Sequence, residues 1–160
     1  MVRERLRLPA QLPAPVQPST KLGNWYVHLA RFGRQQIVLA TSERSLLTVL
    51  LPARQLRENI EVNFQAAVTE LLTALRVPQD KVSCEVAAMH PLSFAAASNR
   101  RVIGSINEFV WQLENCRTRT NDLLSLSLEL SDTPMSAIGS KSNLGFSHLV
   151  ARDLLENREN

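Results

Sequence analysis

The run from Ser98 to Trp111 holds the densest group of side chains in this chain that could bind or react. Ser98 and Asn99 are residue types that cap helices, because their side-chain oxygens accept hydrogen bonds from the free N–H groups of a first turn. Free N–H groups at a helix start attract anions, and the cations Arg100 and Arg101 stand beside them. Two interpretations stay open here: an anion site, or a capped helix start with two solvated arginines.

The remainder of this run predicts a helix with one apolar side and one polar side. Apolar residues recur at helical spacing and are expected to face the core: Val102, Ile103, Ile106, Phe109, Val110, Leu113 and Cys116. Gly104, Asn107, Glu108 and Trp111 share another side at i, i+3, i+4 and i+7. A glycine inside a helix costs about 1 kcal/mol relative to alanine and usually marks the close approach of a backbone or a ligand. The polar side therefore predicts either a pocket or contact surface, or tight helix packing at Gly104.

Histidine is the other residue type that could do chemistry. His28 is predicted to lie on a strand beside Tyr26, where an imidazole can act as acid or base, and a hydrogen-bonded structural histidine is the commoner case. No histidine has a second metal-ligand type two to four residues away, and phosphate-binding glycine loops and serine nucleophile elbows are absent from the sequence. We assign no catalytic residue, no metal site and no cofactor, and an enzyme is the less favoured class.

The positive charge of the chain is concentrated in its first third. The net charge is +3, and residues 1–57 contain Glu4 and Glu43 against nine basic residues: Arg3, Arg5, Arg7, Lys21, Arg31, Arg34, Arg44, Arg54 and Arg57. Such asymmetry permits a surface for nucleic acid or for an acidic protein. We take Arg31, Arg34 and Arg44 as the candidate basic surface.

Length and composition describe one globular domain. A chain of 160 residues can bury a core of its own. We expect a proline- and arginine-rich arm or edge strand over residues 1–20, a single domain over 21–157 and a frayed tail over 158–160. No apolar run reaches the roughly 20 residues of a membrane helix, and no signal peptide is evident, so a cytoplasmic protein without membrane contact is expected. Cys84 and Cys116 are predicted to be reduced thiols, and their separation is left open.

The predicted fold class is α+β, with a small antiparallel sheet from the N-terminal half packed against two main helices and short helices at the C-terminus. Alternation and apolar runs predict strands over 24–32, 36–41, 46–51, 82–86 and 92–97. Helical spacing predicts helices over 54–75, from Ser98 onward, and over 146–154, with a helical turn from Thr133 to Gly139 and a loop over 141–145. Residues 123–130 fit both periods, and helix is preferred because they contain no β-branched residue.

Three motifs resemble an uncharacterised bacterial family that is known only as a domain of unknown function. They are Leu22-Gly23-Asn24-Trp25-Tyr26, then Asn99 to Glu108, then Thr133-Pro134-Met135 with Ile138-Gly139. The family pattern has a G-x-W-Y strand, an N-x-R-S-V-x-G-S-M-N-[DE] helix start and a T-P-M-x-x-[LI]-G element, and the resemblance covers about residues 20 to 140. This chain has Arg101 where serine is usual and Ile106 where methionine is usual. The resemblance implies no activity, supports a helix after Asp122, and singles out five residues for mutation: Trp25, Asn99, Gly104, Ser105 and Asn107.

The leading functional hypothesis is a small bacterial binding or regulatory protein without enzymatic activity that contacts a protein or a nucleic acid. One alternative is a small enzyme or ligand-binding domain with its pocket at the Gly104, Asn107 and Trp111 face and with His28 nearby. A third alternative is a homo-oligomer that assembles through the same face, because an exposed Trp111 would favour an interface.

Overall fold

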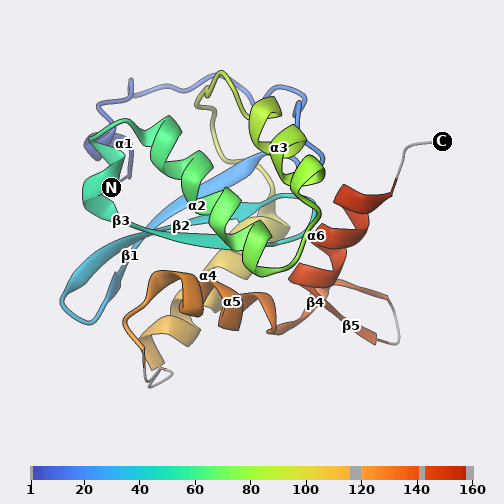
Figure 1. Cartoon of the computed structure of the whole chain (residues 1–160). Helices are drawn as coiled ribbons and strands as arrows, with labels where there is room; N and C mark the ends of the chain where they lie inside the picture. Colours follow the sequence, from blue (N-terminus) through green and yellow to red (C-terminus); the bar gives the residue numbers. More distant parts are fainter. Residues whose placement is uncertain (1, 116–119, 141–142, 158–160) are drawn as a thin grey trace.

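The computed structural model describes residues 2–115, 120–140 and 143–157, which form an α+β fold around a three-stranded antiparallel sheet (Figure 1). The strands are β1 (Trp25–Phe32), β2 (Gln35–Ser42) and β3 (Thr48–Pro52), in that order across the sheet. Short connections join them, because consecutive antiparallel strands need only a tight turn. The predicted fold class and the predicted antiparallel sheet in the N-terminal half are confirmed.

The sheet is buried on both of its faces, because successive side chains of a strand point to opposite sides. One face belongs to a core cluster that contains Val38, Ala40, Val49 and Leu51, and the other to a cluster that contains Tyr26, Ile37, Leu39 and Leu50. The central strand β2 has neighbours on both edges and cover on both faces. Its continuous apolar run from Ile37 to Ala40 is accordingly no more than 1% exposed.

Helices cover both faces of the sheet (Figure 1). The first face packs against α2 (Ile60–Ala74), α3 (Gln79–Ala88) and α6 (Ser147–Glu156), and the second against α4 (Arg100–Asn115). The next helix, α5 (Leu123–Ser131), lies along the edge strand β3, and the Ser127 hydroxyl accepts a hydrogen bond from the Leu50 N–H at 3.0 Å. This contact occupies a backbone donor at the sheet edge, which would otherwise be open to strand pairing. The helix prediction for residues 123–130 is confirmed.

The helix predicted over residues 54–75 is interrupted. A 3₁₀ turn, η1 (Ala53–Leu56), comes first, and α2 begins only at Ile60 because Asn59 has a left-handed backbone with φ of 50°. Asn63 donates to the Gln55 carbonyl at 3.2 Å and to the Glu58 carbonyl, so it holds the interrupted segment. Leu56 and Phe64 still join one core cluster, which explains why the apolar spacing looked continuous.

The strands predicted over 82–86 and 92–97 are wrong. Residues 79–88 form α3, and residues 92–97 form no regular element. The alternation of Val82, Cys84 and Val86 suggested a strand, but the buried pair is Val82 and Glu85, which are three residues apart on one helical face. Cys84 is exposed, and Cys116 lies outside the described residues. The burial of Glu85 has no signal in the sequence, because carboxylates rarely lie inside a core.

The C-terminal third contains a hairpin where a helical turn and a loop were predicted. Strands β4 (Pro134–Ser140) and β5 (Asn143–Phe146) pair antiparallel, whereas Lys141 and Ser142 lie outside the described residues. A side chain at Gly145 would bring its Cβ within 2.7 Å of the Ile138 carbonyl oxygen, so the two strands can approach only because residue 145 is glycine. The final helix was predicted correctly and forms α6.

The N-terminal segment begins with one helical turn, α1 (Val2–Arg5), and continues as an arm without helix or strand up to residue 20. The arm is tied to the body by hydrogen bonds from the Ala96 N–H to the Pro13 carbonyl at 2.9 Å and from Asn24 Nδ2 to the Val16 carbonyl at 3.1 Å. Four prolines lack N–H groups, so this segment cannot join the sheet as an inner strand. Residues 2–20 contain no strand, so of the two expectations for residues 1–20 the arm describes this segment.

Asp122 caps α5, and its titration should be visible in the stability of the protein. Its carboxylate accepts from the Ser125 hydroxyl at 2.6 Å and from the Ser125 N–H at 2.8 Å, and these bonds hold the pKa of Asp122 below its ordinary value of 3.8. Because the pKa is lower in the folded state than in the unfolded state, the ionised carboxylate stabilises the fold fully at pH values above 3.8. This contribution to the free energy of unfolding is lost as the pH falls through the folded-state pKa. Replacement Asp122→Ala should therefore lower the urea midpoint at about pH 7, with Asp122→Asn milder because asparagine also caps. The gap between wild type and Asp122→Ala should narrow as the pH falls below 3.8, and a constant gap would contradict this role.

Candidate functional site

Asn99 caps α4 and connects it to the sheet. Its Oδ1 accepts from the N–H groups of Arg101 at 3.0 Å and Val102 at 3.5 Å. Its Nδ2 donates to the Glu43 carboxylate at 3.2 Å, and its own N–H donates to the Tyr26 hydroxyl at 3.2 Å. The capping prediction is correct. The N–H groups of Arg101 and Val102, which were expected to attract an anion, therefore already donate to the Asn99 side chain.

Arg101 joins a turn and a strand that are far apart in the sequence. Its guanidinium donates to the Glu43 carbonyl at 2.7 Å, in the β2–β3 connection, and to the Ala137 carbonyl at 3.3 Å, in β4. The Ser105 hydroxyl is buried and donates to the Arg101 carbonyl at 3.1 Å, inside α4. These two candidate binding residues therefore make intramolecular contacts, whereas Arg100 is exposed to solvent.

The polar side of α4 is an exposed surface and not a packing contact. Gly104, Asn107 and Glu108 are all exposed, and Trp111 is 62% exposed. Apart from the neighbouring residues and backbone of α4 itself, no described atom lies within 4 Å of where a Cβ on Gly104 would stand. The interpretation of tight packing against another part of the chain at Gly104 is therefore wrong for the described residues. The opposite side of the helix is fully buried at Val102 and Phe109. We call this surface, consisting of Arg100, Ile103, Gly104, Asn107, Glu108, Trp111 and Glu114, the outer face of α4.

Trp25 and His28 lie apart from this surface. The Trp25 ring packs edge-on against Phe64 of α2, with ring centroids 5.2 Å apart, so it belongs to the first core cluster. His28 is exposed and lies between Tyr26 and Ala30 on the sheet side that α4 covers. The outer face of α4 points away from the sheet, because Phe109 on the helix's other side fills the contact with it. The structure therefore does not bring His28 and Trp111 to one pocket.

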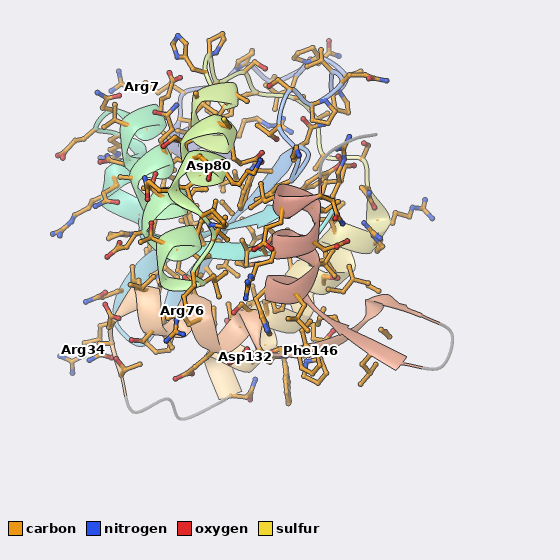
Figure 2. All side chains as sticks on the ribbon, turned by 45° about the vertical axis from the view of Figure 1, so that its right-hand side comes forward. Arg7, Arg34, Arg76, Asp80, Asp132 and Phe146 are labelled. Atoms are coloured by element: carbon orange, nitrogen blue, oxygen red, sulfur yellow. The ribbon has the colours of Figure 1, made fainter. Side chains whose placement is uncertain are left out.

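The three candidate basic residues divide between two ends of the sheet. Arg34 lies in the β1–β2 turn with Arg31 just before it, and Arg44 lies beyond the other end of β2. Eight residues of strand separate these ends by about 25 Å. The Arg44 guanidinium donates to the Lys21 carbonyl at 3.2 Å, whereas Arg34 extends away from the body of the molecule (Figure 2).

Two further arginines join Arg31 and Arg34. Because Ile37 of β2 pairs with Pro52 of β3, the segment after β3 begins at the same end of the sheet as the β1–β2 turn. That segment is η1 with Arg57 directly after it, and both Arg54 and Arg57 are exposed. We call Arg31, Arg34, Arg54 and Arg57 the basic end. Sequence spacing alone could not place the last two, because their position depends on the strand register.

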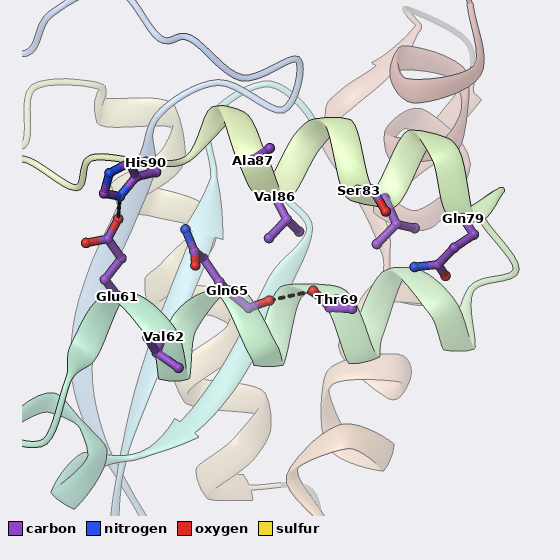
Figure 3. A pocket seen from close by; sticks show the side chains of 10 residues that line it. Glu61, Val62, Gln65, Thr69, Gln79, Ser83, Val86, Ala87 and His90 are labelled. Carbon is purple, nitrogen blue, oxygen red and sulfur yellow. Dashed lines mark hydrogen bonds and ion pairs between the residues drawn. The ribbon is translucent and has the colours of Figure 1, made fainter.

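A groove between α2 and α3 was not predicted. It has a volume of about 650 Å³ and is lined by Glu61, Val62, Gln65, Thr69, Gln79, Val82, Ser83, Val86, Ala87 and His90 (Figure 3). Residues 61, 65 and 69 recur at four-residue spacing, which was the only sequence signal for it. The His90 imidazole bonds to the Glu61 carboxylate at one end, and a carboxylate–imidazole pair is a common acid–base unit. Here the His90 side chain is 71% exposed, so the pair is open to solvent.

The pocket that was predicted at Gly104, Asn107 and Trp111 does not coincide with a described hollow. A second hollow of about 230 Å³ lies between β3, α2 and α5, and neither it nor the α2–α3 groove includes those three residues. Within residues 2–115, 120–140 and 143–157, no cluster of three metal-ligand side chains occurs. No helix in the described part of the chain is long and apolar enough to cross a membrane.

Comparison with known proteins connects these observations to one family. No curated protein and no solved structure matches the chain. A family model does match, over residues 2–147, and its description is Domain of unknown function (DUF6933). The match includes the arm, the sheet, α4 and its capping motif, and the β4–β5 hairpin, and it confirms the resemblance to an uncharacterised domain family. The chain therefore belongs to the DUF6933 family of domains of unknown function.

Proposed function

We propose that this protein is a non-enzymatic binding domain that contacts the phosphate groups of a nucleic acid through its basic end. The observation that carries the proposal is the gathering of four exposed guanidinium groups, from two separate segments, at one end of the sheet. Among the ion pairs of the described residues, none involves these four arginines. Their charge is therefore available to a partner.

The chemistry of the basic end favours phosphate over a single carboxylate. Guanidinium groups form paired hydrogen bonds with phosphate oxygens, and several groups spread over two segments match a repeating charge. The N-terminal segment with its arginines contacts β1 through α1, and Leu6 packs on the same face of the sheet as η1. Only 5% of the residues are aromatic, so stacking on bases contributes little and binding should depend weakly on base sequence.

Fluorescence anisotropy with labelled duplex DNA, single-stranded DNA and RNA tests the proposal. On duplex DNA the logarithm of the affinity falls with the logarithm of the salt concentration, and each phosphate contact makes this slope more negative by about 0.9. Four contacts predict a slope of about −4 for the wild-type protein. The variant with Arg31, Arg34, Arg54 and Arg57 all changed to Gln should lose nearly all of that slope and bind at least about 100-fold more weakly at low salt.

A matched control removes the same charge elsewhere. Arg44, Arg76, Lys81 and Arg152 lie outside the basic end, and their joint replacement by Gln lowers the net charge by the same amount. This control should keep most of the affinity and the slope. Equal losses in the two variants would show only a general charge effect and would contradict the assignment of the basic end. Absence of binding at low salt would reject a nucleic-acid partner.

A further inference from the structure

The outer face of α4 has a hole and a knob on the same line of the helix. Gly104 leaves open space above the backbone, and the large Trp111 ring stands seven residues further on. Seven residues are two helical turns, so the two positions differ by only about 20° around the helix and by about 10.5 Å along it. A glycine here weakens the helix, and a tryptophan with 62% of its surface in water loses the stabilisation of burial. In the described part of the chain nothing occupies the space beside Gly104, and most of the Trp111 surface stays uncovered.

We propose that a second copy of this chain covers the outer face of α4, with the two α4 helices antiparallel around a two-fold axis. The proposal does not depend on nucleic-acid binding. In such a pair the axis passes between residues 107 and 108, and each residue i stands level with residue 215 − i of the other copy. Gly104 then stands level with Trp111 of the second copy, and the contact occurs twice by symmetry.

The shape of the face supports this register. Arg100, Ile103, Gly104 and Asn107 are four residues at i, i+3, i+4 and i+7, which is the arrangement that surrounds a hole on a helix surface. The glycine removes the side chain that would close the hole. Trp111 of the second copy would enter it and pack on the exposed part of Ile103. Any other side chain at position 104 would block this entry, which explains why a glycine is tolerated inside α4.

The charges of the face agree with a second copy as the occupant. Arg100 of one copy stands level with residue 115 of the other copy, one position from Glu114. Arg100 and Glu114 lie on the same flank of the helix, and the two-fold axis places that flank of one copy beside the same flank of the other. Each copy therefore places a cation opposite an anion of the other. Asn107 faces its own symmetry mate on that flank, where two carboxamides can exchange hydrogen bonds. The two Glu108 carboxylates flank the axis on the other side, and their repulsion weakens the pair. One helix pair buries less than the roughly 1,200 Å² of a standard interface, so we expect dissociation at about 10 to 100 µM.

Sedimentation equilibrium over about 5 to 500 µM protein at physiological salt measures the dimer directly. We expect wild type to change from monomer to dimer across this range, with a blue shift of tryptophan emission as Trp111 becomes buried. The variants Trp111→Ala and Gly104→Leu should each raise the dissociation constant at least about 30-fold, because central aromatic residues dominate such contacts. Leu149→Ala, which truncates a residue of α6 that is 53% exposed, is the matched control and should leave it unchanged.

Charge exchange tests the antiparallel register. Arg100→Glu and Glu114→Arg should each weaken the dimer, and the double variant should restore it, because every cation again faces an anion. Circular dichroism must show wild-type helix content in all variants, which is expected because the altered side chains are exposed. A wild-type protein that stays monomeric at about 500 µM would overturn the proposal. So would a dimer that Trp111→Ala and Gly104→Leu leave intact, or a double charge variant that is no better than the single ones.

Discussion

Phe109→Ala should lower the free energy of unfolding by about 4 kcal/mol, the largest single effect that we expect in this protein. The Phe109 ring is 0% exposed and lies where α4 meets the second face of the sheet, among Tyr26, Leu39 and Leu113. Its removal loses the transfer free energy of a large aromatic side chain and leaves a cavity, because β2 and α4 are held by other contacts and cannot collapse into it. Urea denaturation followed by circular dichroism measures the change.

Trp111→Ala is the internal control for Phe109→Ala, because it removes an even larger ring from the same helix two residues later. Trp111 is 62% exposed, so this change should alter the stability of the monomer by less than about 0.5 kcal/mol. Both measurements should be made at low protein concentration, where a dimer through α4 is dissociated. Equal destabilisation by the two substitutions would contradict the assignment of the buried and outer faces of α4.

Glu85→Ala should cost about 3 kcal/mol, although glutamate is normally a surface residue. Glu85 on α3 is only 3% exposed. Its two carboxylate oxygens accept hydrogen bonds from the backbone N–H groups of Lys21 and Leu22, each at 2.9 Å. Leu22 is itself 0% exposed, so its N–H finds no water when the carboxylate is removed. These two hydrogen bonds hold the segment before β1 against α3, although Lys21 and Leu22 are 64 and 63 positions from Glu85 in the sequence.

Glu85→Gln separates hydrogen bonding from shape. The glutamine carboxamide retains one acceptor oxygen for one of the two backbone N–H groups. Its NH₂ group can only donate, so it would face the other N–H group donor to donor. We therefore expect Glu85→Gln to lose at least half as much stability as Glu85→Ala. Glu70→Ala on the exposed side of α2 is the matched control and should change stability by less than about 0.5 kcal/mol. If Glu85→Ala costs less than about 1 kcal/mol, the two N–H groups do not depend on this carboxylate.

The sequence by itself determined the elements whose signal is local. The continuous apolar run of β2, the helical spacing of α4 with its Asn99 cap, and the final helix α6 all appear where they were predicted. Each of these patterns arises because one segment must bury a particular face, and the period of the apolar residues records that face. The same local patterns allowed the resemblance to a domain family, which the family model confirms.

Only the tertiary structure decided features in which distant segments meet. Glu85 could be buried in α3 because the N–H groups of residues 21 and 22 happen to face it, and this partner is invisible in the alternation of Val82, Cys84 and Val86. The β4–β5 hairpin likewise depends on Gly145 approaching the Ile138 carbonyl. In both cases a long-range contact outweighs a local preference of a few tenths to one kcal/mol per residue.

For the candidate surfaces too, the sequence predicted the residue types, and the tertiary structure decided which residues lie together. Residue types pointed to the asparagine, arginine and glycine of the α4 motif, but only the fold shows that Asn99 and Arg101 hold the β2–β3 connection while Gly104 and Trp111 face outward. Arg31, Arg34 and Arg44 looked equivalent, yet the length of β2 separates Arg44 from the other two and the β2–β3 register brings Arg54 and Arg57 to them. Spacing along one segment determines which side a residue faces, whereas strand register determines which residues become neighbours, and register is a property of the whole sheet.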